Sequence, residues 1–105
     1  MKRKIDIVIT RHRGLVEYLK EEGLIDDGVQ VVSHATGEMV RGKVVLGNLP
    51  FYLASQARKV IVPVLELRPE DRGKDLTKEQ VRARLRGLNA YIVVDLGSIE
   101  EDEND

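Results

Sequence analysis

The segment that decides the fold is Ile5-Asp6-Ile7-Val8-Ile9-Thr10-Arg11-His12, in which a β-branched apolar run ends directly in a threonine, an arginine and a histidine. A continuous apolar run of this kind predicts a buried strand, which we expect over residues 4–10. Two later apolar runs, 44–46 and 60–65, also end in polar or glycine-containing loops. Because ligands bind at the carboxyl ends of parallel strands in an open α/β sheet, we expect these loops to meet in one crevice.

The composition suits one small soluble domain, which we expect over residues 1–99. The chain has 105 residues, of which 42% are hydrophobic, and this is enough for a core. It contains no cysteine, which excludes disulfides, thiol catalysis and cysteine-type zinc sites. No apolar stretch approaches the roughly 18 residues of a membrane span, and the basic residues 1–4 lack the features of a secretory signal. We therefore expect a cytoplasmic protein without a membrane partner.

The net charge of −1 hides an asymmetry between the body and the end of the chain. Residues 100–105 hold five acidic side chains, so residues 1–99 carry a net charge of +4. A mildly basic body is compatible with a polyanionic ligand but falls far short of the excess typical of a duplex-DNA binder. The acidic end predicts a solvated, disordered tail.

The order of apolar runs and helical patterns predicts an α/β fold. We expect strands over 4–10, 29–33, 43–46, 60–67 and 91–96. Helices are expected over 14–22 and 50–58, and a third helix after Thr77 has an apolar stripe of Val81, Leu85 and Leu88. Residues 34–42 form a loop or single turn, and residues 68–75 form a charged loop. This alternation indicates a mostly parallel sheet with helices on both faces, in three layers, although the strand order stays open. A sheet this small is commonly completed by dimerisation, and Phe51-Tyr52 is equally well an interface element or part of the core.

Arg11 and His12 are the sharpest candidates for function. Directly after a buried strand, Arg11 is placed to grip a phosphate bidentately, and His12 can act as an acid, a base or a donor near neutral pH. The alternative is a solvated loop whose histidine caps the next helix. Ser33-His34 repeats the pattern more weakly, and since no acidic residue is evident to orient the histidine, a surface turn is the favoured interpretation.

The Gly47-Asn48-Leu49-Pro50 loop is a second candidate, because glycine permits close backbone approach and a helix start presents N–H groups. It lacks the spacing of a Walker loop and of the G-x-G-x-x-G fingerprint, so neither a nucleotide triphosphate nor a dinucleotide cofactor is supported. Glu66, Asp71 and Arg72 are outer candidates for orienting a ligand. No group of His, Asp and Glu shows metal-ligand spacing, so we expect no cofactor and catalysis without a metal.

The ordered motifs resemble the Csx-sixteen family of CRISPR-associated ancillary proteins. They are Ile9-Thr10-Arg11-His12, Val32-Ser33-His34, the segment 42–50, Leu65-Glu66-Leu67-Arg68-Pro69 and the segment 72–77, and the resemblance spans roughly residues 5–90. The sequence departs from the family pattern at Asn48, where a small hydroxyl residue is usual, and at Arg13, where proline is common.

The resemblance implies a compact CARF-like, Rossmann-like homodimer of type III CRISPR antiviral defence. The implied activity is that of a ring nuclease, which cleaves a cyclic oligoadenylate messenger without a metal, and cyclic tetra-adenylate is the ring that the resemblance favours. On this hypothesis Arg11 and His12 are catalytic, and Thr10, Ser33, His34, Gly47, Asn48, Leu49 and Arg72 bind substrate.

Three other readings stay open at this stage. One is a sponge or sensor that binds the same messenger without cutting it. Another is a histidine phosphatase, because Arg11-His12 resembles the Arg-His-Gly start of those enzymes, although Arg13 interrupts that motif. The last is a plain interaction module.

Overall fold

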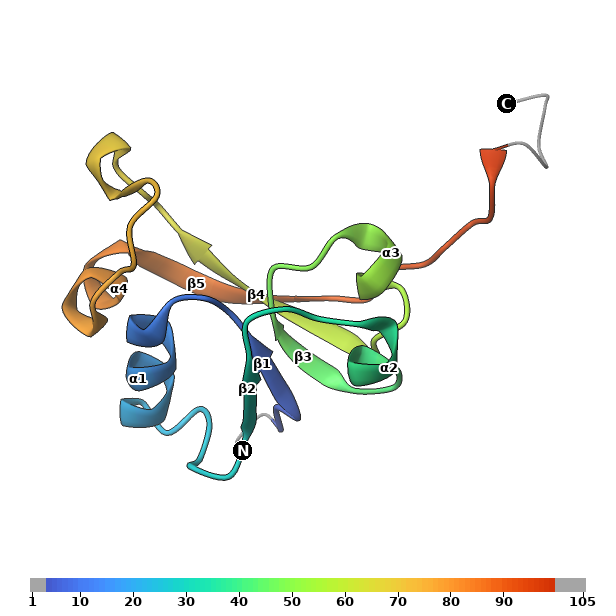
Figure 1. Ribbon diagram of the computed structural model, residues 1–105, viewed down its shortest axis with the longest axis horizontal. Coiled ribbons are helices and arrows are strands. Elements are labelled where there is room, and N and C mark those ends of the chain that lie inside the picture. The colour runs from blue at the N-terminus through green and yellow to red at the C-terminus, as the bar shows by residue number, and fades with distance from the viewer. Residues whose placement is uncertain (1–3, 100–105) are drawn as a thin grey trace.

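The computed structural model describes residues 4–99, which form one five-stranded sheet with helices around it (Figure 1). The sheet order is β2-β1-β3-β4-β5. The elements in chain order are β1 (Ile7–Ile9), α1 (Arg13–Glu21), β2 (Gln30–Val32), α2 (Gly37–Val40), β3 (Val44–Gly47), α3 (Phe51–Ala54), β4 (Lys59–Leu65), the 3₁₀ turn η1 (Pro69–Asp71), α4 (Lys78–Arg84) and β5 (Leu85–Tyr91).

The sheet is parallel except at one edge. β1 pairs in parallel with both β2 and β3, and β3 pairs in parallel with β4, whereas β5 runs antiparallel to β4. The chain leaves β1 through α1 to reach the edge strand β2, then returns to the other side of β1 as β3. The strand order therefore reverses between β1 and β3, which is the position where doubly wound sheets bind ligands. The predicted mostly parallel α/β fold is confirmed.

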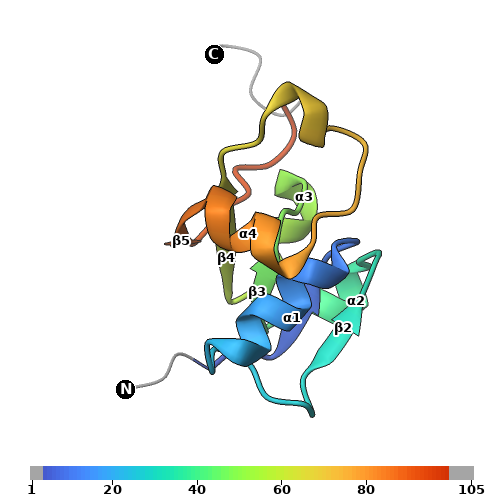
Figure 2. The ribbon, with the colours of Figure 1, turned by 90° about the vertical axis from the view of Figure 1, so that its left-hand side faces the viewer.

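Helices cover both faces of the sheet, so the predicted three layers are present (Figures 1 and 2). Successive residues of a strand point to opposite faces, and the core divides accordingly. Val8, Leu46 and Ile61 pack with Leu15 of α1 and Val81 of α4 on one face. On the other face, Val40 of α2 packs with Ile7, Ile9 and Val45 in a smaller cluster.

Helix α3 is shorter than the predicted span of 50–58. Pro50 caps it, and the helix ends at Ala54. The backbone after α3 instead forms hydrogen bonds with residues 42 and 43. Gly42 N–H donates to the Gln56 carbonyl at 3.0 Å, and Arg58 N–H donates to the Lys43 carbonyl at 2.9 Å. The short α2 is the single turn expected within 34–42.

The prediction of a third helix reaching Leu88 is wrong, since α4 ends at Arg84 and β5 follows at once. The register explains the misleading pattern. Pro63 faces Leu88, Val64 faces Gly87 and Leu65 faces Leu85, so Arg86 is an extra residue in a β-bulge. The bulge places Leu85 and Leu88 on one face of the strand, and their spacing of three residues imitates a helix.

The predicted strand over 91–96 is also wrong. β5 ends at Tyr91, which pairs with Val60 near the beginning of β4. Beyond that point the chain has run past the end of its neighbour, so residues 92–96 have no strand beside them among the described residues. The predicted acidic tail, 100–105, lies outside the described residues. None of the helices in residues 4–99 has the length and apolar character needed to cross a membrane.

Candidate functional site

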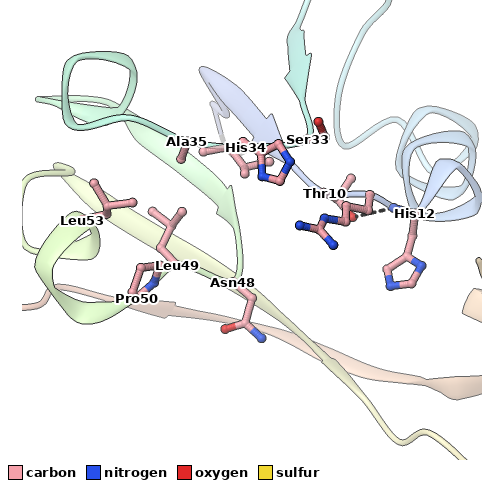
Figure 3. Close-up of a pocket in the computed structure, with 11 residues that line it drawn as sticks. Thr10, His12, Ser33, His34, Ala35, Asn48, Leu49, Pro50 and Leu53 are labelled. Atoms are coloured by element: carbon pink, nitrogen blue, oxygen red, sulfur yellow. Dashed lines mark hydrogen bonds between the residues drawn. The ribbon is translucent and has the colours of Figure 1, made fainter. Parts of the chain in front are cut away.

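A pocket of about 420 Å³ lies where β1, β2 and β3 end, at the reversal of strand order (Figure 3). Eleven residues from the three strand-end loops and α3 line it: Ile9, Thr10, Arg11, His12, Ser33, His34, Ala35, Asn48, Leu49, Pro50 and Leu53. His34 and Asn48 stand on opposite sides, with His12 at one end and Leu53 at the other (Figure 3). The structure thus brings seven of the nine sequence-predicted site residues together.

The loop after β1 is fixed by its own backbone and by Thr10. Thr10 N–H donates to the Val32 carbonyl at the end of β2 at 3.0 Å. The Thr10 hydroxyl oxygen accepts from His12 N–H at 3.0 Å. The His12 carbonyl in turn accepts from Leu15 N–H in the first turn of α1. Thr10 therefore positions this loop as well as lining the pocket.

The ring of His12 is held by a residue that is distant from it in the sequence. Leu76 N–H donates to His12 Nδ1 in a long hydrogen bond of 3.5 Å, across 64 positions of sequence. An accepting nitrogen carries no proton, so the neutral ring in this arrangement is protonated on Nε2, which is a donor. His12 is half-buried, and its Nδ1 is already engaged by the Leu76 N–H group.

The other polar side chains of the pocket make no hydrogen bond or ion pair within the part of the chain that the structure describes. Within residues 4–99, the side chains of Arg11, Ser33, His34 and Asn48 form no hydrogen bond or ion pair, and all four residues are exposed. None of the eleven lining residues is acidic. The pocket therefore offers one permanent positive charge and several free donors, a combination that suits an anionic ligand.

Gly47 and Arg72 are the two predicted site residues that do not line this pocket. Gly47 is buried at the end of β3, where a Cβ atom would lie 2.5 Å from the Ile9 carbonyl oxygen. It has no side chain because β1 and β3 approach closely beside the site. Arg72 is exposed in the loop that projects beyond β4 (Figure 1), and its contact with a ligand stays a prediction.

Asp71 and Glu66, the outer acidic candidates, are engaged in structural contacts. Asp71 is buried and accepts from Arg84 Nε at 2.8 Å and from Arg68 N–H at 2.9 Å. The hydrogen bond from Arg84, followed by that from the Arg68 backbone, lowers the pKa of Asp71. Glu66 accepts from Arg86 Nε at 2.6 Å. These contacts tie the 66–76 loop to α4 and β5.

A second hollow, of about 300 Å³, shares the Thr10–His12 loop and Ser33 with the pocket. Arg13 and the aliphatic side chains of Val16, Val31 and Val32 complete it. Sequence reasoning treated Arg13 only as an interruption of a motif, although its position directly after Arg11-His12 was a usable signal. The Leu76 contact had no signal in the sequence.

Fold and pocket together define a small Rossmann-like α/β protein with a pocket at the strand-order reversal. Among residues 4–99, no group of three or more His, Asp or Glu side chains is arranged to hold a metal ion.

Residues 7–94 match the family model described as "Putative CRISPR-associated protein (Cas_VVA1548)". The match covers more than four-fifths of the chain, so the protein belongs to this family of CRISPR-associated proteins. No curated protein and no solved structure matches it.

Proposed function

We propose that this CRISPR-associated protein is a ring nuclease that binds a cyclic oligoadenylate, cyclic tetra-adenylate in the first instance, and cleaves it to end type III signalling. The observation that carries the proposal is the pocket itself: three strand-end loops present Arg11, His12, His34 and Asn48 together with no carboxylate among them. Membership of a CRISPR-associated family supplies the setting.

The reaction is an in-line transesterification. A ribose 2′-oxygen attacks the neighbouring phosphorus, the bond from phosphorus to the 5′-oxygen breaks, and the proton lost by the 2′-hydroxyl is balanced by one gained at the 5′-oxygen. No water is consumed. Two such cuts convert the ring into two linear di-adenylates, each ending in a 2′,3′-cyclic phosphate. The step depends mainly on alignment and on stabilising the charge of the phosphoryl oxygens.

Arg11 is the group that stabilises this charge. Its guanidinium has no partner within residues 4–99, so it binds a phosphate without first breaking an internal ion pair. Its fixed fork of donors matches two phosphate oxygens. The beginning of α1 lies two residues further on and favours negative charge at the same place.

His12 is a positioning hydrogen-bond donor in the proposed mechanism. Because Leu76 N–H occupies Nδ1, the Nε2–H group is the one offered to the ligand. It orients the 2′-hydroxyl for attack or stabilises the negative charge on a phosphoryl oxygen, and the 5′-oxygen takes its proton from water. The loss of one such donor costs typically about 10²–10³-fold in rate.

The remaining residues hold the nucleotide. Asn48 and His34 face each other across the pocket and act as hydrogen-bond donors to the sugar–phosphate, with Ser33 beside them (Figure 3). The adjoining hollow has aliphatic walls at Val16 and Val31, and the planar guanidinium of Arg13 is suited to stacking on an adenine. A pocket of about 420 Å³ suits part of a ring, and two copies related by a twofold axis offer equivalent donors to both halves of a four-phosphate circle.

The deciding experiment incubates the protein with labelled cyclic tetra-adenylate and resolves the products by chromatography. We expect turnover to linear di-adenylate with a cyclic phosphate end. His12→Asn keeps an acceptor near the Nδ1 position for Leu76 but has no donor at the Nε2 position, so cleavage should fall about 10²–10³-fold while the melting temperature changes little.

His12→Gln is the matched variant, because its amide places a hydrogen-bond donor near the Nε2 position. It should bind the ring and cut it faster than His12→Asn does. Wild-type cleavage by both variants would contradict the assignment of His12. Stoichiometric binding of an uncut ring by the wild-type protein would replace the nuclease with a sponge, and no binding at all would overturn the proposal.

A further inference from the structure

The positive charge of the molecule is concentrated in one part of the chain. Residues 39–65 contain four basic side chains, Arg41, Lys43, Arg58 and Lys59, and no acidic one. Residues 1–99 carry a net charge of +4, so acidic and basic side chains balance in the rest of that range. Basic side chains of α4 and β5 pair with carboxylates, whereas these four form no ion pair within residues 4–99.

The backbone brings these four cations together. Arg58 N–H donates to the Lys43 carbonyl at 2.9 Å, and Arg41 pairs with Ala57 in an antiparallel bridge. The two turns that carry the cations therefore run side by side where β3 and β4 begin. Like charges on neighbouring backbone segments destabilise one another. An anion bound along this edge of the molecule would remove that repulsion.

Two aromatic side chains of α3 continue the same surface. The Tyr52 carbonyl accepts from Gln56 Nε2 at 3.1 Å, and Gln56 Oε1 accepts from Arg41 Nη2 at 3.5 Å, so the aromatic and basic parts are contiguous. Residues 93–96 of the same chain border Phe51 and Tyr52 on one side, but the two residues stay 81% and 69% exposed.

The chain has four aromatic residues, so half of them stand next to each other on this surface. An exposed pair of aromatic rings beside unpaired cations is not explained by the packing of the domain. We call this surface the basic strip, and its members are Arg41, Lys43, Phe51, Tyr52, Arg58 and Lys59.

The basic strip is separate from the strand-end pocket. None of its six residues lines that pocket. The pocket lies where β1, β2 and β3 end, whereas the cations of the strip lie where β3 and β4 begin. The strip follows α2 and α3, which lie against each other at one end of the molecule (Figure 1). A ligand on the strip therefore does not have to enter the pocket.

We propose that the basic strip binds a single strand of nucleic acid, with phosphates on the cations and bases stacked on Phe51 and Tyr52. Sites for single strands combine these two elements, because every base has a flat face that stacks on an aromatic ring. The guanidinium groups of Arg41 and Arg58 present fixed forks of donors that match phosphate oxygens. This binding is a second activity, and it does not rest on the proposed ring cleavage.

The aromatic rings favour this partner over other polyanions. An acidic protein segment or the backbone of a duplex would use the cations and leave Phe51 and Tyr52 without a role. Binding to a lipid surface commonly uses a long amphipathic helix with an apolar face, and α3 has only four residues. A single strand uses both kinds of side chain.

The test measures fluorescence anisotropy of a labelled oligodeoxythymidylate of about 12 nucleotides, a length within the usual range for single-strand sites. This probe does not pair with itself, and it has no 2′-hydroxyl, so the proposed transesterification cannot consume it. We expect a dissociation constant on the order of 10 μM at low salt, as for binding without sequence preference. The logarithm of the association constant should fall with the logarithm of salt concentration with a slope of about −3, since each of four cations contributes about −0.7.

Two double variants of equal charge separate the strip from the net charge of the protein. Arg41→Gln/Arg58→Gln removes two cations of the strip, and its salt slope should be shallower than that of the wild type by about 1.4. Lys74→Gln/Arg86→Gln removes two exposed cations outside the strip and should behave as the wild type. Equal losses in the two double variants would overturn the proposal.

Tyr52 tests the stacking contact. Tyr52→Ala should weaken binding about 5–100-fold with an unchanged salt slope, because stacking of one base on an aromatic ring has about this effect. Tyr52→Phe keeps the ring and should bind as the wild type does. Wild-type affinity in Tyr52→Ala, together with equally strong binding of polyglutamate, would assign the strip to an acidic protein instead.

The two proposals fail separately. A wild-type protein without affinity for the oligonucleotide, or one from which saturating cyclic tetra-adenylate displaces it, would refute the basic strip as its site. Binding of the oligonucleotide that persists in cyclic tetra-adenylate and is lost in Arg41→Gln/Arg58→Gln supports the strip, whether or not the protein cuts the ring.

Discussion

The two faces of the sheet are built in different ways. On one face, α1 and α4 lie side by side (Figure 2) and share a core cluster of nine buried residues. Ion pairs from Glu21 to Lys78 and Arg82 join the two helices at the surface. On the other, α2 and α3 have four residues each and cover a cluster of four buried residues. The first face contains the larger part of the core, whereas the second leaves the pocket open to other molecules.

His12 is the link between the two faces. Its backbone caps α1 and its Nδ1 accepts from Leu76 just before α4, while its ring lines the pocket. Contacts on the face covered by α1 and α4 therefore set the orientation of the His12 ring, which lines the pocket. Site residues held by rigid elements keep their geometry better than residues on free loops.

The largest effect is expected where the two helices of the packed face touch. A Cβ atom on Gly14 would lie 2.1 Å from the Leu76 carbonyl oxygen and 2.5 Å from the Thr77 carbonyl carbon, both backbone atoms that cannot move alone. Gly14→Ala should lower the free energy of unfolding by about 3 kcal/mol, the upper end of the usual range for overpacking. Urea denaturation measures it.

Gly87→Ala is the control for this substitution. Nothing lies within 4 Å of a Cβ atom at Gly87, and its backbone does not adopt a positive φ. Stability should change little there. Equal losses for Gly14→Ala and Gly87→Ala would show that the contact with Leu76 is not tight.

The next largest effect is expected on the open face. Arg11→Ala should weaken binding of cyclic tetra-adenylate by about 10–100-fold, because hydrogen bonds to charged groups contribute about 1.5–3 kcal/mol. Its melting temperature should stay near that of the wild type, since Arg11 has no partner within residues 4–99. Isothermal titration calorimetry and a thermal melt separate the two effects.

Arg86→Ala is the matched control, because this exposed arginine pairs with Glu66 away from the pocket. It should leave ligand affinity unchanged. A loss of affinity as large as that of Arg11→Ala would mean that the mildly basic body, rather than the pocket, attracts the ligand.

The sequence predicted the central strands and the pocket better than it predicted where helices and strands end. Apolar runs located β1, β3 and β4, and the rule that loops gather at the carboxyl ends of parallel strands anticipated the pocket around Arg11 and Asn48. These predictions succeeded because continuous apolar character and strand polarity are local properties of the chain.

The errors arose where a tertiary contact overrides a local pattern. The bulge at Arg86 gave Leu85 and Leu88 a helical spacing within a strand, and pairing with residues 42–43 ended α3 early. The engagement of His12 with Leu76 and of Asp71 with Arg84 depends on residues far apart in the sequence. No local pattern encodes such contacts.

A smaller effect, dependent on pH, is expected at Asp71. The hydrogen bond from Arg84 lowers the pKa of this carboxylate below its usual value of 3.8 in the folded protein. The unfolded chain therefore takes up the proton first as the pH falls, so the stability that Asp71 contributes is present above about pH 4 and lost at lower pH. Asp71→Asn should be less stable than the wild type at neutral pH, and the difference should shrink in acid.

Thermal melts from neutral pH to below pH 3 measure this convergence. Asp75→Asn, an exposed residue of the same loop, should track the wild type throughout. A gap between Asp71→Asn and the wild type that stays constant with pH would indicate lost packing rather than a lost charge.

The smallest effect is expected for the surface ion pairs that join α1 to α4. Glu21 accepts from Lys78 Nζ at 2.7 Å and also pairs with Arg82, and the bond from Lys78 lowers the pKa of Glu21. These side chains remain accessible to water, and such pairs are screened by salt and contribute little. Glu21→Gln should lower the melting temperature slightly at low salt and not at high salt, with Glu17→Gln of the same helix as control. If Glu21→Gln instead cost as much as Gly14→Ala at any salt concentration, the packed face would depend on its charges rather than on the contact between Gly14 and Leu76.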